Sequence, residues 1–202
     1  MTDGGDADNR TTLAAYELHA ERYAHRTSAE ASSLVDELLP LVPAGSRVLE
    51  LGSGPGTDAL ALERAGLVVE RTDGASSFVD RFRQGGLSAR ELDFYADDFG
   101  GPYDAIFANA VLLHAARERL AGVLSVALAA VRTGGVLAAT FKKGEGDEWS
   151  TRKLDTARHF TYWQEHELRQ ALHDSGWQPI RIVESTAEGA AERWITITAL
   201  RP

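Results

Sequence analysis

The segment that most constrains the fold is VLELGSGPGTDALAL, from Val48 to Leu62, in which a short apolar strand leads directly into a glycine-rich loop and then a helix. Gly52, Gly54 and Gly56 stand at every second position, so the backbone can turn sharply there and a ligand can approach it closely. The free N–H groups and partial positive charge of the helix start suit a negative ligand group. We therefore expect a strand–loop–helix unit that binds a cofactor.

Segments typical of strands and helices alternate on both sides of this loop. Buried strands are predicted at 46–51, 67–71, 88–92, 103–108 and 136–141, and helices at 57–65, 76–84 and 116–131. This alternation predicts a parallel sheet covered by helices on both faces. After a helix over 164–175, strands at 180–184 and 194–200 predict a hairpin with an antiparallel last strand. The expected fold class is α/β, Rossmann-like and doubly wound, with a mostly parallel seven-stranded sheet.

The chain is predicted to form one domain behind a short tail. Residues 1–10 are polar, acidic and contain glycine, so we expect them to be disordered. Helical spacing of apolar residues begins at Thr11, and a second helix is predicted over 28–39. The 202 residues fit a single domain over 11–202. It would consist of the helical segment 11–43 and a strand–helix core over 44–202.

The net charge and the missing residue types narrow the function. The formal net charge of −9 disfavours binding to the phosphate backbone of nucleic acids. The absence of cysteine excludes disulfides, thiolate metal sites and cysteine nucleophiles, and the histidines form no metal-ligand pattern, so no metal is expected. No apolar run approaches the roughly 20 residues that span a bilayer, and the N-terminal MTDGGDADNR lacks an apolar signal segment. We expect a cytoplasmic protein, monomeric or homodimeric, without nucleic-acid or membrane partners.

Two classes of cofactor use a strand–glycine-loop–helix unit. A dinucleotide site requires G-x-G-x-x-G, but here the third glycine of that pattern is missing and Pro55 lies inside the loop. The loop instead resembles the first motif of the class I S-adenosylmethionine-dependent methyltransferases, E/D-x-G-x-G-x-G. Glu50, Gly52, Gly54 and Gly56 match each of its positions. In that resemblance Glu50 helps to place the cationic part of the cofactor.

Later motifs of this family have counterparts in the same order. The resemblance implies that Asp73, in VVERTDGASSF, holds both ribose hydroxyls, because a carboxylate accepts two hydrogen bonds. It implies that Phe78 and Asp93 contact the adenine. Helix N-capping is the structural alternative for Asp73, and loop capping is the alternative for Asp93. The remaining positions carried over as cofactor-binding are Ser53, Gly74, Phe94 and Asn109. The resemblance covers about residues 13–200.

The helix over ELHAERYAHRT is similar to one that many small-molecule methyltransferases lay over the cofactor. The resemblance implies that residues 11–43 form an N-terminal helical lid. It also implies that Tyr23 and Arg26 meet the methionine carboxylate of the cofactor.

The acceptor side is less constrained. His114, shortly after the fourth strand, is the predicted general base, and a partly buried structural histidine is the alternative. The segment KKGEGDEWSTRKLDTARHFTYW, residues 142–163, follows the fifth strand at the sheet edge where open α/β folds bind ligands. We predict a mobile loop there whose aromatic residues line an acceptor pocket or, alternatively, pack onto the core. The residues predicted to bind the acceptor are Tyr16, His19, His114, Arg158, Phe160 and Tyr162.

The resemblance implies a methyltransferase that moves a methyl group from S-adenosylmethionine to an O, N or C nucleophile of a small molecule and leaves S-adenosylhomocysteine. Alignment of the reacting groups can supply much of the rate. A tRNA or protein methyltransferase and a non-catalytic S-adenosylmethionine-binding module are the alternatives. A nicotinamide oxidoreductase fits poorly because of the missing third glycine.

Overall fold

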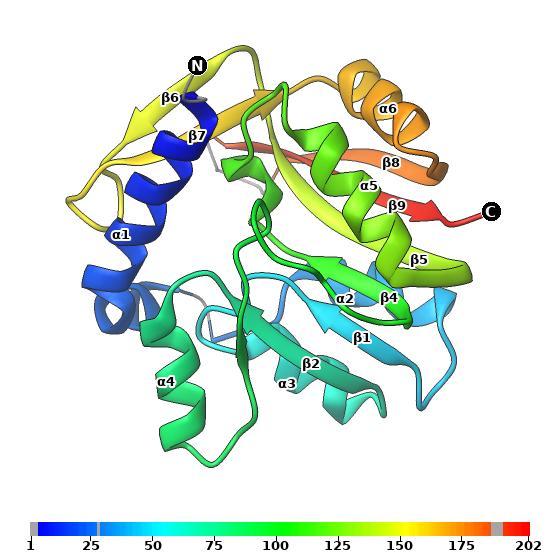
Figure 1. The fold of residues 1–202 in the computed structure, drawn as a ribbon, viewed down its shortest axis with the longest axis horizontal. Coiled ribbons are helices and arrows are strands. Elements are labelled where there is room, and N and C mark those ends of the chain that lie inside the picture. The colour runs from blue at the N-terminus through cyan, green and yellow to red at the C-terminus, as the bar shows by residue number, and fades with distance from the viewer. Residues whose placement is uncertain (1–3, 28, 187–191) are drawn as a thin grey trace.

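A computed structural model describes residues 4–27, 29–186 and 192–202. Within these ranges, helices flank one mixed sheet of nine strands (Figure 1). The strands are β1 Arg47–Glu50, β2 Val68–Asp73, β3 Arg90–Glu91, β4 Tyr103–Ala108, β5 Val131–Lys143, β6 Asp147–Ser150, β7 Arg158–Trp163, β8 Gln178–Thr186 and β9 Arg193–Leu200. The α-helices are α1 Gly4–Arg26, α2 Ser33–Leu38, α3 Thr57–Arg64, α4 Ser76–Gln84, α5 Leu120–Ala130 and α6 Glu165–Asp174, and two 3₁₀ turns span Leu39–Leu41 and Leu112–His114.

The strand order confirms the expected fold class. Strands β3, β2, β1, β4 and β5 lie side by side and run parallel. Strand β9 runs antiparallel between β5 and β8. The carboxyl ends of the parallel strands therefore meet at one edge of the sheet, where ligands bind in open α/β folds.

Alternation along the central strands divides the core between the two faces of the sheet. Leu49 and Ile106 belong to a buried cluster with Leu124 of α5. Their chain neighbours Val48 and Phe107 belong to a second cluster, which includes apolar residues of α2 and α3. Figure 1 shows α5 on one side of the sheet and α2 and α3 on the other. Such continuous apolar runs are typical of strands buried on both faces.

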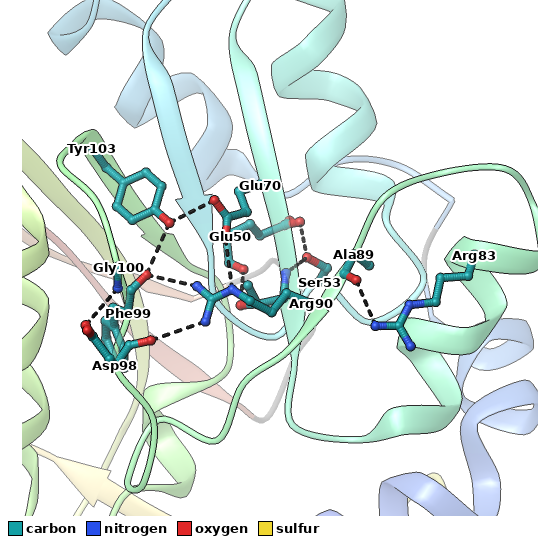
Figure 2. A network of polar contacts seen from close by, with 11 residues as sticks. Glu50, Ser53, Glu70, Arg83, Ala89, Arg90, Asp98, Phe99, Gly100 and Tyr103 are labelled. Atoms are coloured by element: carbon teal, nitrogen blue, oxygen red, sulfur yellow. Dashed lines mark hydrogen bonds and ion pairs between the residues drawn. The ribbon is translucent and has the colours of Figure 1, made fainter.

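Polar side chains fix the short strand β3 to its neighbours. Glu70 of β2 accepts a hydrogen bond of 2.8 Å from the Tyr103 hydroxyl and forms an ion pair of 2.9 Å with Arg90 of β3 (Figure 2). Arg90 also donates to the carbonyl oxygens of Asp98 and Phe99. These contacts hold the loop after β3, whose start contributes to the site described below.

The prediction of a loop over residues 142–163 is wrong. Strands β6 and β7 form an antiparallel hairpin there. Strand β5 extends beyond the end of β4, and its Lys142 and Lys143 pair in parallel with Tyr162 and Trp163 of β7. Because β9 occupies the other side of Lys142, β7 continues the sheet on the side of β4. The hairpin therefore stands directly above the carboxyl end of β4 and raises the strand count from the expected seven to nine.

The N-terminal helix also begins earlier than expected. Helix α1 starts at Gly4, within the segment expected to be disordered, and residues 1–3 lie outside the described ranges. Figure 1 shows α1 beside β6 and β7, where it covers the carboxyl edge of the sheet.

Smaller differences concern the element bounds. Helix α2 is shorter than the predicted helix, whose start at residue 28 lies outside the described ranges, as does the turn at 187–191. Helix α5 begins at Leu120 rather than at 116, because a 3₁₀ turn at Leu112–His114 precedes it.

Candidate active site

A cavity of about 350 Å³ opens at the carboxyl edge of the sheet beneath α1. Loops after β1, β2, β3 and β4 form its floor, and α1 with the segment after it forms its roof. Thirteen of the residues predicted from the sequence line it: Tyr16, Tyr23, Glu50, Gly52, Ser53, Gly54, Asp73, Gly74, Phe78, Asp93, Phe94, Asn109 and His114. The structure therefore brings most of the predicted site together from segments far apart in the chain.

Asp73 is a buried carboxylate held from two sides. Its side chain ends β2, and the residue is 8% exposed. Oδ2 accepts a hydrogen bond of 2.9 Å from the Gly54 N–H, and Oδ1 accepts one of 2.9 Å from the Ala75 N–H. Burial raises the pKa of Asp73 to about 6, although these backbone bonds oppose the shift. Each oxygen keeps a lone pair, so the carboxylate can accept two further hydrogen bonds from a diol.

Glu50 is a second buried acid at the end of β1. It accepts a hydrogen bond from the Ser53 hydroxyl (Figure 2), and the Ser53 oxygen accepts one of 3.2 Å from the Thr72 N–H. Burial raises the pKa of Glu50 to about 8, and the bond from Ser53 opposes this shift. A cationic ligand group near Glu50 would stabilise its ionised form. This end of the cavity therefore suits a positive charge.

The three glycines of the loop have different functions. All three have positive φ angles, but only Gly54 would leave room for a Cβ atom, with nothing closer than 3.9 Å. A Cβ on Gly52 would lie 2.4 Å from a methyl of Val111, and one on Gly56 would lie 2.5 Å from the Phe82 ring. Gly52 and Gly54 line the cavity, whereas Gly56, also predicted to bind the cofactor, does not. Gly56 allows the N-terminus of α3 to pack against α4.

An aromatic and an acid form the opposite end of the cavity. Phe78 is 2% exposed and packs edge-on against Tyr23, with 6.0 Å between ring centroids. Both carboxylate oxygens of Asp93 accept from the Asn9 amide, at 3.0 and 3.1 Å. Asn9 lies in the segment expected to be disordered and was not predicted to belong to the site. It links α1 to the loop after β3.

Asn109 takes part in a network that the sequence did not indicate. Its side-chain amide N–H donates a hydrogen bond of 2.9 Å to the Asp58 carboxylate, and its side-chain carbonyl oxygen accepts one of 2.8 Å from the Thr140 hydroxyl. Asp58 also accepts 2.7 Å from the Ser32 N–H, so it joins the start of α3 to the segment before α2. Asp58 and Ser32 both line the cavity. Asp58 follows the last glycine of the loop by two residues in the chain, and this position could have drawn attention to it.

His114 and Tyr16 form a hydrogen-bonded pair in the cavity wall. Nδ1 of His114 lies 2.6 Å from the carbonyl oxygen of His159, which only accepts, so Nδ1 carries the hydrogen. Nε2 is then the acceptor and receives the Tyr16 O–H at 3.0 Å. Burial lowers the pKa of His114 to about 3, and the nearby charge of Arg158 adds to this shift. His114 is therefore a neutral imidazole with both nitrogens bonded.

Arg158 lies behind this pair rather than in the cavity lining. Its Nη1 donates 3.1 Å to the Tyr16 hydroxyl oxygen, and the residue is 3% exposed. Phe160, also predicted to bind the acceptor, packs against the His114 ring at 4.7 Å between centroids. Both residues support the wall from β7 without reaching the cavity.

Two other predicted residues, both on α1, lie outside the cavity lining. His19 forms a hydrogen bond of 2.7 Å with the Thr156 hydroxyl, and Arg26 donates one of 2.6 Å to the Lys153 carbonyl oxygen. These two residues therefore join α1 to the loop between β6 and β7.

Tyr162 has no place in the cavity either. Its hydroxyl donates 2.7 Å to Glu148 across the β6–β7 hairpin. Burial and the neighbouring Glu148 carboxylate raise the pKa of Tyr162. Its prediction as an acceptor-binding residue depended on a loop at 142–163, and the hairpin turns it outward.

Two features are absent among the residues that the structure describes. None of their His, Asp and Glu side chains gather in threes with the geometry of a metal site. None of their helices is both long and apolar enough to cross a membrane.

Residues 23–182 match a family model described as a methyltransferase domain. Similar solved structures include the 1,6-didemethyltoxoflavin N1-methyltransferase of Burkholderia thailandensis with bound 1,6-didemethyltoxoflavin and S-adenosylhomocysteine (TM-score 0.77, 16% identity, 97% of this chain and 88% of that chain). The magnesium protoporphyrin IX methyltransferase of Synechocystis PCC 6803, with bound S-adenosylhomocysteine, has a TM-score of 0.63 at 17% identity over 96% of this chain and 86% of that one. The [4+2]-cyclase SpnF has a TM-score of 0.73 at 17% identity over 96% of both chains. No curated protein matches the sequence significantly.

Proposed function

Because the chain belongs to the methyltransferase domain family, which uses S-adenosylmethionine, we propose that it transfers the methyl group of S-adenosylmethionine to a small-molecule acceptor. The observation that carries this proposal is Asp73. It is a buried carboxylate in the cavity wall, and no cation pairs with it among the residues that the structure describes. Burying such a group is costly unless hydrogen bonds satisfy it. The two hydroxyls of a ribose are donors that fit its free lone pairs.

The other lining residues fit the remaining parts of the cofactor. Phe78 offers an apolar face for the adenine, and Asp93 offers an acceptor for its amino group. Gly54 leaves open space beside the backbone, and Glu50 supplies a negative charge for the methionine ammonium. When bound, S-adenosylmethionine supplies a methyl group made electrophilic by its sulfonium. The protein's own residues align the acceptor and exclude water beneath α1.

A small acceptor is supported by the size and cover of the cavity. About 350 Å³ lies near the lower end of the range for small-molecule pockets, and α1 with the segment after it forms a roof over it. Two neighbours in fold act on small molecules, namely 1,6-didemethyltoxoflavin and magnesium protoporphyrin IX. The net charge of −9 disfavours RNA as the acceptor.

The general-base role predicted for His114 gains no support from its surroundings. Its Nε2 lone pair is engaged by Tyr16, and its low pKa disfavours the imidazolium. We propose instead that His114 orients the Tyr16 hydroxyl in the acceptor site.

The test uses S-adenosylmethionine labelled on the methyl group. The protein is incubated separately with metabolite extract, total RNA and total protein, and Asp73→Ala serves as the control. Label in the metabolite fraction that disappears in the control is the expected result. Label in RNA or protein would show that the acceptor is a macromolecule instead of a small molecule. No transfer to any fraction, together with retained cofactor binding, would indicate a non-catalytic module.

A further inference from the structure

Arg158 is a buried cation that no carboxylate neutralises within residues 4–27, 29–186 and 192–202. It is 3% exposed, its Nη1 donates to the Tyr16 hydroxyl, and its other Nη donates to the Arg152 carbonyl. Its buried Nε has no hydrogen-bond partner. A buried charge is expensive unless an opposite charge accompanies it. The missing counter-charge points to an anion that comes from outside the chain.

The hydrogen bonds around Tyr16 all run in one direction. Arg158 donates to the Tyr16 oxygen, Tyr16 donates to Nε2 of His114, and Nδ1 of His114 donates to the His159 carbonyl. Bonds aligned in this way polarise one another, so the positive charge of Arg158 makes the Tyr16 O–H a stronger donor. Tyr16 lines the cavity, and it is through this hydroxyl that Arg158 can influence a ligand.

The charged side chains that line the cavity are acidic, whereas the cations lie behind the wall that Tyr16 and His114 form. Glu50, Asp58 and Asp73 line the cofactor end. Behind Tyr16 and His114 lie Arg158 and Lys142, and Lys142 is 8% exposed with its Nζ 4.1 Å from the centre of the Phe160 ring. Lys142 pairs with Glu192 at 3.2 Å, whereas no carboxylate in the part of the chain that the structure describes pairs with Arg158. A negative group is therefore favoured beside Tyr16.

We propose that Arg158, acting through the Tyr16 hydroxyl, makes the enzyme select acceptors whose attacking oxygen is already anionic near neutral pH, namely a carboxylate or an acidic phenol or enol. This inference rests on the proposed function. In the transfer, a bond forms between that oxygen and the methyl carbon, and the carbon–sulfur bond breaks with its electron pair passing to sulfur. No proton moves in this step. The product carries one negative charge fewer than the acceptor.

The same wall disfavours a neutral alcohol as the acceptor. An aliphatic alcohol keeps its proton at neutral pH and needs a base during transfer. His114 is the only histidine in the cavity lining described here, and its Nε2 is bonded to Tyr16. An ionised acceptor needs no base, and it can compete with His114 for the Tyr16 O–H.

The first experiment fractionates the metabolite extract on an anion exchanger at pH 8 before labelling. We expect label in products from the retained, anionic fraction, and each labelled product should carry one negative charge fewer than its acceptor by electrophoretic mobility. Label from the unretained fraction alone, or a product with the charge of its acceptor, would overturn the inference and leave the proposed function standing. If neither fraction yields a labelled product, the result contradicts the proposed function and, with it, this inference.

The second experiment assigns the effect to Arg158 with purified acceptor. Arg158→Gln should raise the KM for the acceptor by about tenfold or more, the size of one lost charge-assisted hydrogen bond, with a smaller change in kcat. Arg158→Lys should restore much of the lost affinity because it keeps the charge. Calorimetry should show S-adenosylhomocysteine affinity within about twofold of the wild type in both variants.

Arg169→Gln is the matched control, because Arg169 is an exposed arginine of α6 that pairs with Glu165. It should leave both KM and cofactor affinity unchanged. An Arg158→Gln protein with wild-type KM contradicts the inference. Equal losses of acceptor and cofactor affinity also contradict it, because a merely structural role would produce them.

Discussion

The backbone N–H of Gly54 donates a hydrogen bond of 2.9 Å to Oδ2 of Asp73. This bond joins the loop after β1 to the end of β2, two segments 19 residues apart in the chain. The glycine loop therefore positions the acid as well as leaving space for a ligand. A change in either residue should disturb cofactor binding through the other.

Asp73→Ala should weaken S-adenosylhomocysteine binding by roughly 1.5–3 kcal/mol, the scale of a lost charge-assisted hydrogen bond. The physical reason is that the variant removes both acceptors proposed for the ribose. Titration calorimetry measures the change directly. Asp174→Ala, at the exposed end of α6, is the control and should bind as the wild type does. Unchanged affinity in Asp73→Ala would refute the assignment of Asp73.

The pH dependence of binding should follow the same carboxyl group. Burial raises the pKa of Asp73 from 3.8 to about 6, so affinity for S-adenosylhomocysteine should fall as the pH drops from 7 to 5 and the carboxylate is protonated. Stability should respond in the opposite direction. Between pH 6 and 3.8 the folded state binds more protons than the unfolded state, so this group adds to the free energy of unfolding as the pH falls.

Asp73→Asn provides the comparison for both measurements. An amide does not titrate, so the part of each pH dependence that comes from Asp73 should disappear. Calorimetry and denaturant unfolding at pH 7, 6 and 5 test this. Parallel pH curves for the two proteins would show that Asp73 is not the titrating group.

Alanine substitutions in the loop should separate folding from binding. Gly52→Ala should lower the free energy of unfolding by about 2–4 kcal/mol, because its Cβ would meet Val111 at 2.4 Å and its φ is +63°. Gly54→Ala should cost only about 1 kcal/mol of stability, since its Cβ meets nothing closer than 3.9 Å. Its methyl would instead occupy the cavity and reduce S-adenosylhomocysteine affinity.

Denaturant unfolding and calorimetry on the two variants give this comparison. Gly52→Ala combined with Val111→Ala should recover part of the lost stability, because the second change removes the methyl that clashes. If Gly54→Ala is the less stable variant, or Gly54→Ala binds as tightly as the wild type, the division of functions within the loop is wrong.

The parts of the fold that the sequence predicted are those encoded locally. The strand, glycine loop and helix around Gly54 are consecutive in the chain, and Asp73 directly ends the next strand. The hairpin over 142–163 escaped prediction because β6 has only four residues, two of them acidic, and β7 begins with Arg158 and His159. The hairpin forms because β5 extends beyond the end of β4, so that Lys142 and Lys143 are free to pair with β7. The periodicity of apolar residues in the sequence does not indicate such a long-range strand pairing.

The same limit applies to the site. Tyr16 and His114 were predicted as separate contributors, yet their bond spans 98 residues and fixes the tautomer of the imidazole. Arg158 was predicted to contact the acceptor, but its position on β7 places it one side chain behind the cavity wall. Residue type and order indicated which groups gather at this edge. The depth of each group depends on the packing of α1 against the hairpin.

Asn9→Ala should loosen α1 without harming the core. The Asn9 amide is 2% exposed and contacts both oxygens of Asp93, a residue 84 positions away. Without the Asn9 amide, the Asp93 carboxylate keeps the hydrogen bond from the Tyr95 N–H. The local stability should fall by about 1–3 kcal/mol. Hydrogen exchange should therefore quicken over residues 8–20, and S-adenosylhomocysteine should dissociate faster because α1 covers the cavity. The strands of the sheet should keep their protection.

Arg10→Ala is the matched control for this prediction, because Arg10 is an exposed neighbour on the same turn of α1. It tests whether any substitution near the start of the helix has the same effect. We expect its exchange and its S-adenosylhomocysteine dissociation rate to equal those of the wild type. If Asn9→Ala and Arg10→Ala behave alike, the contact with Asp93 does not hold α1 over the cavity, and the closure must come from the contacts of His19, Arg22 and Arg26 with the β6–β7 loop.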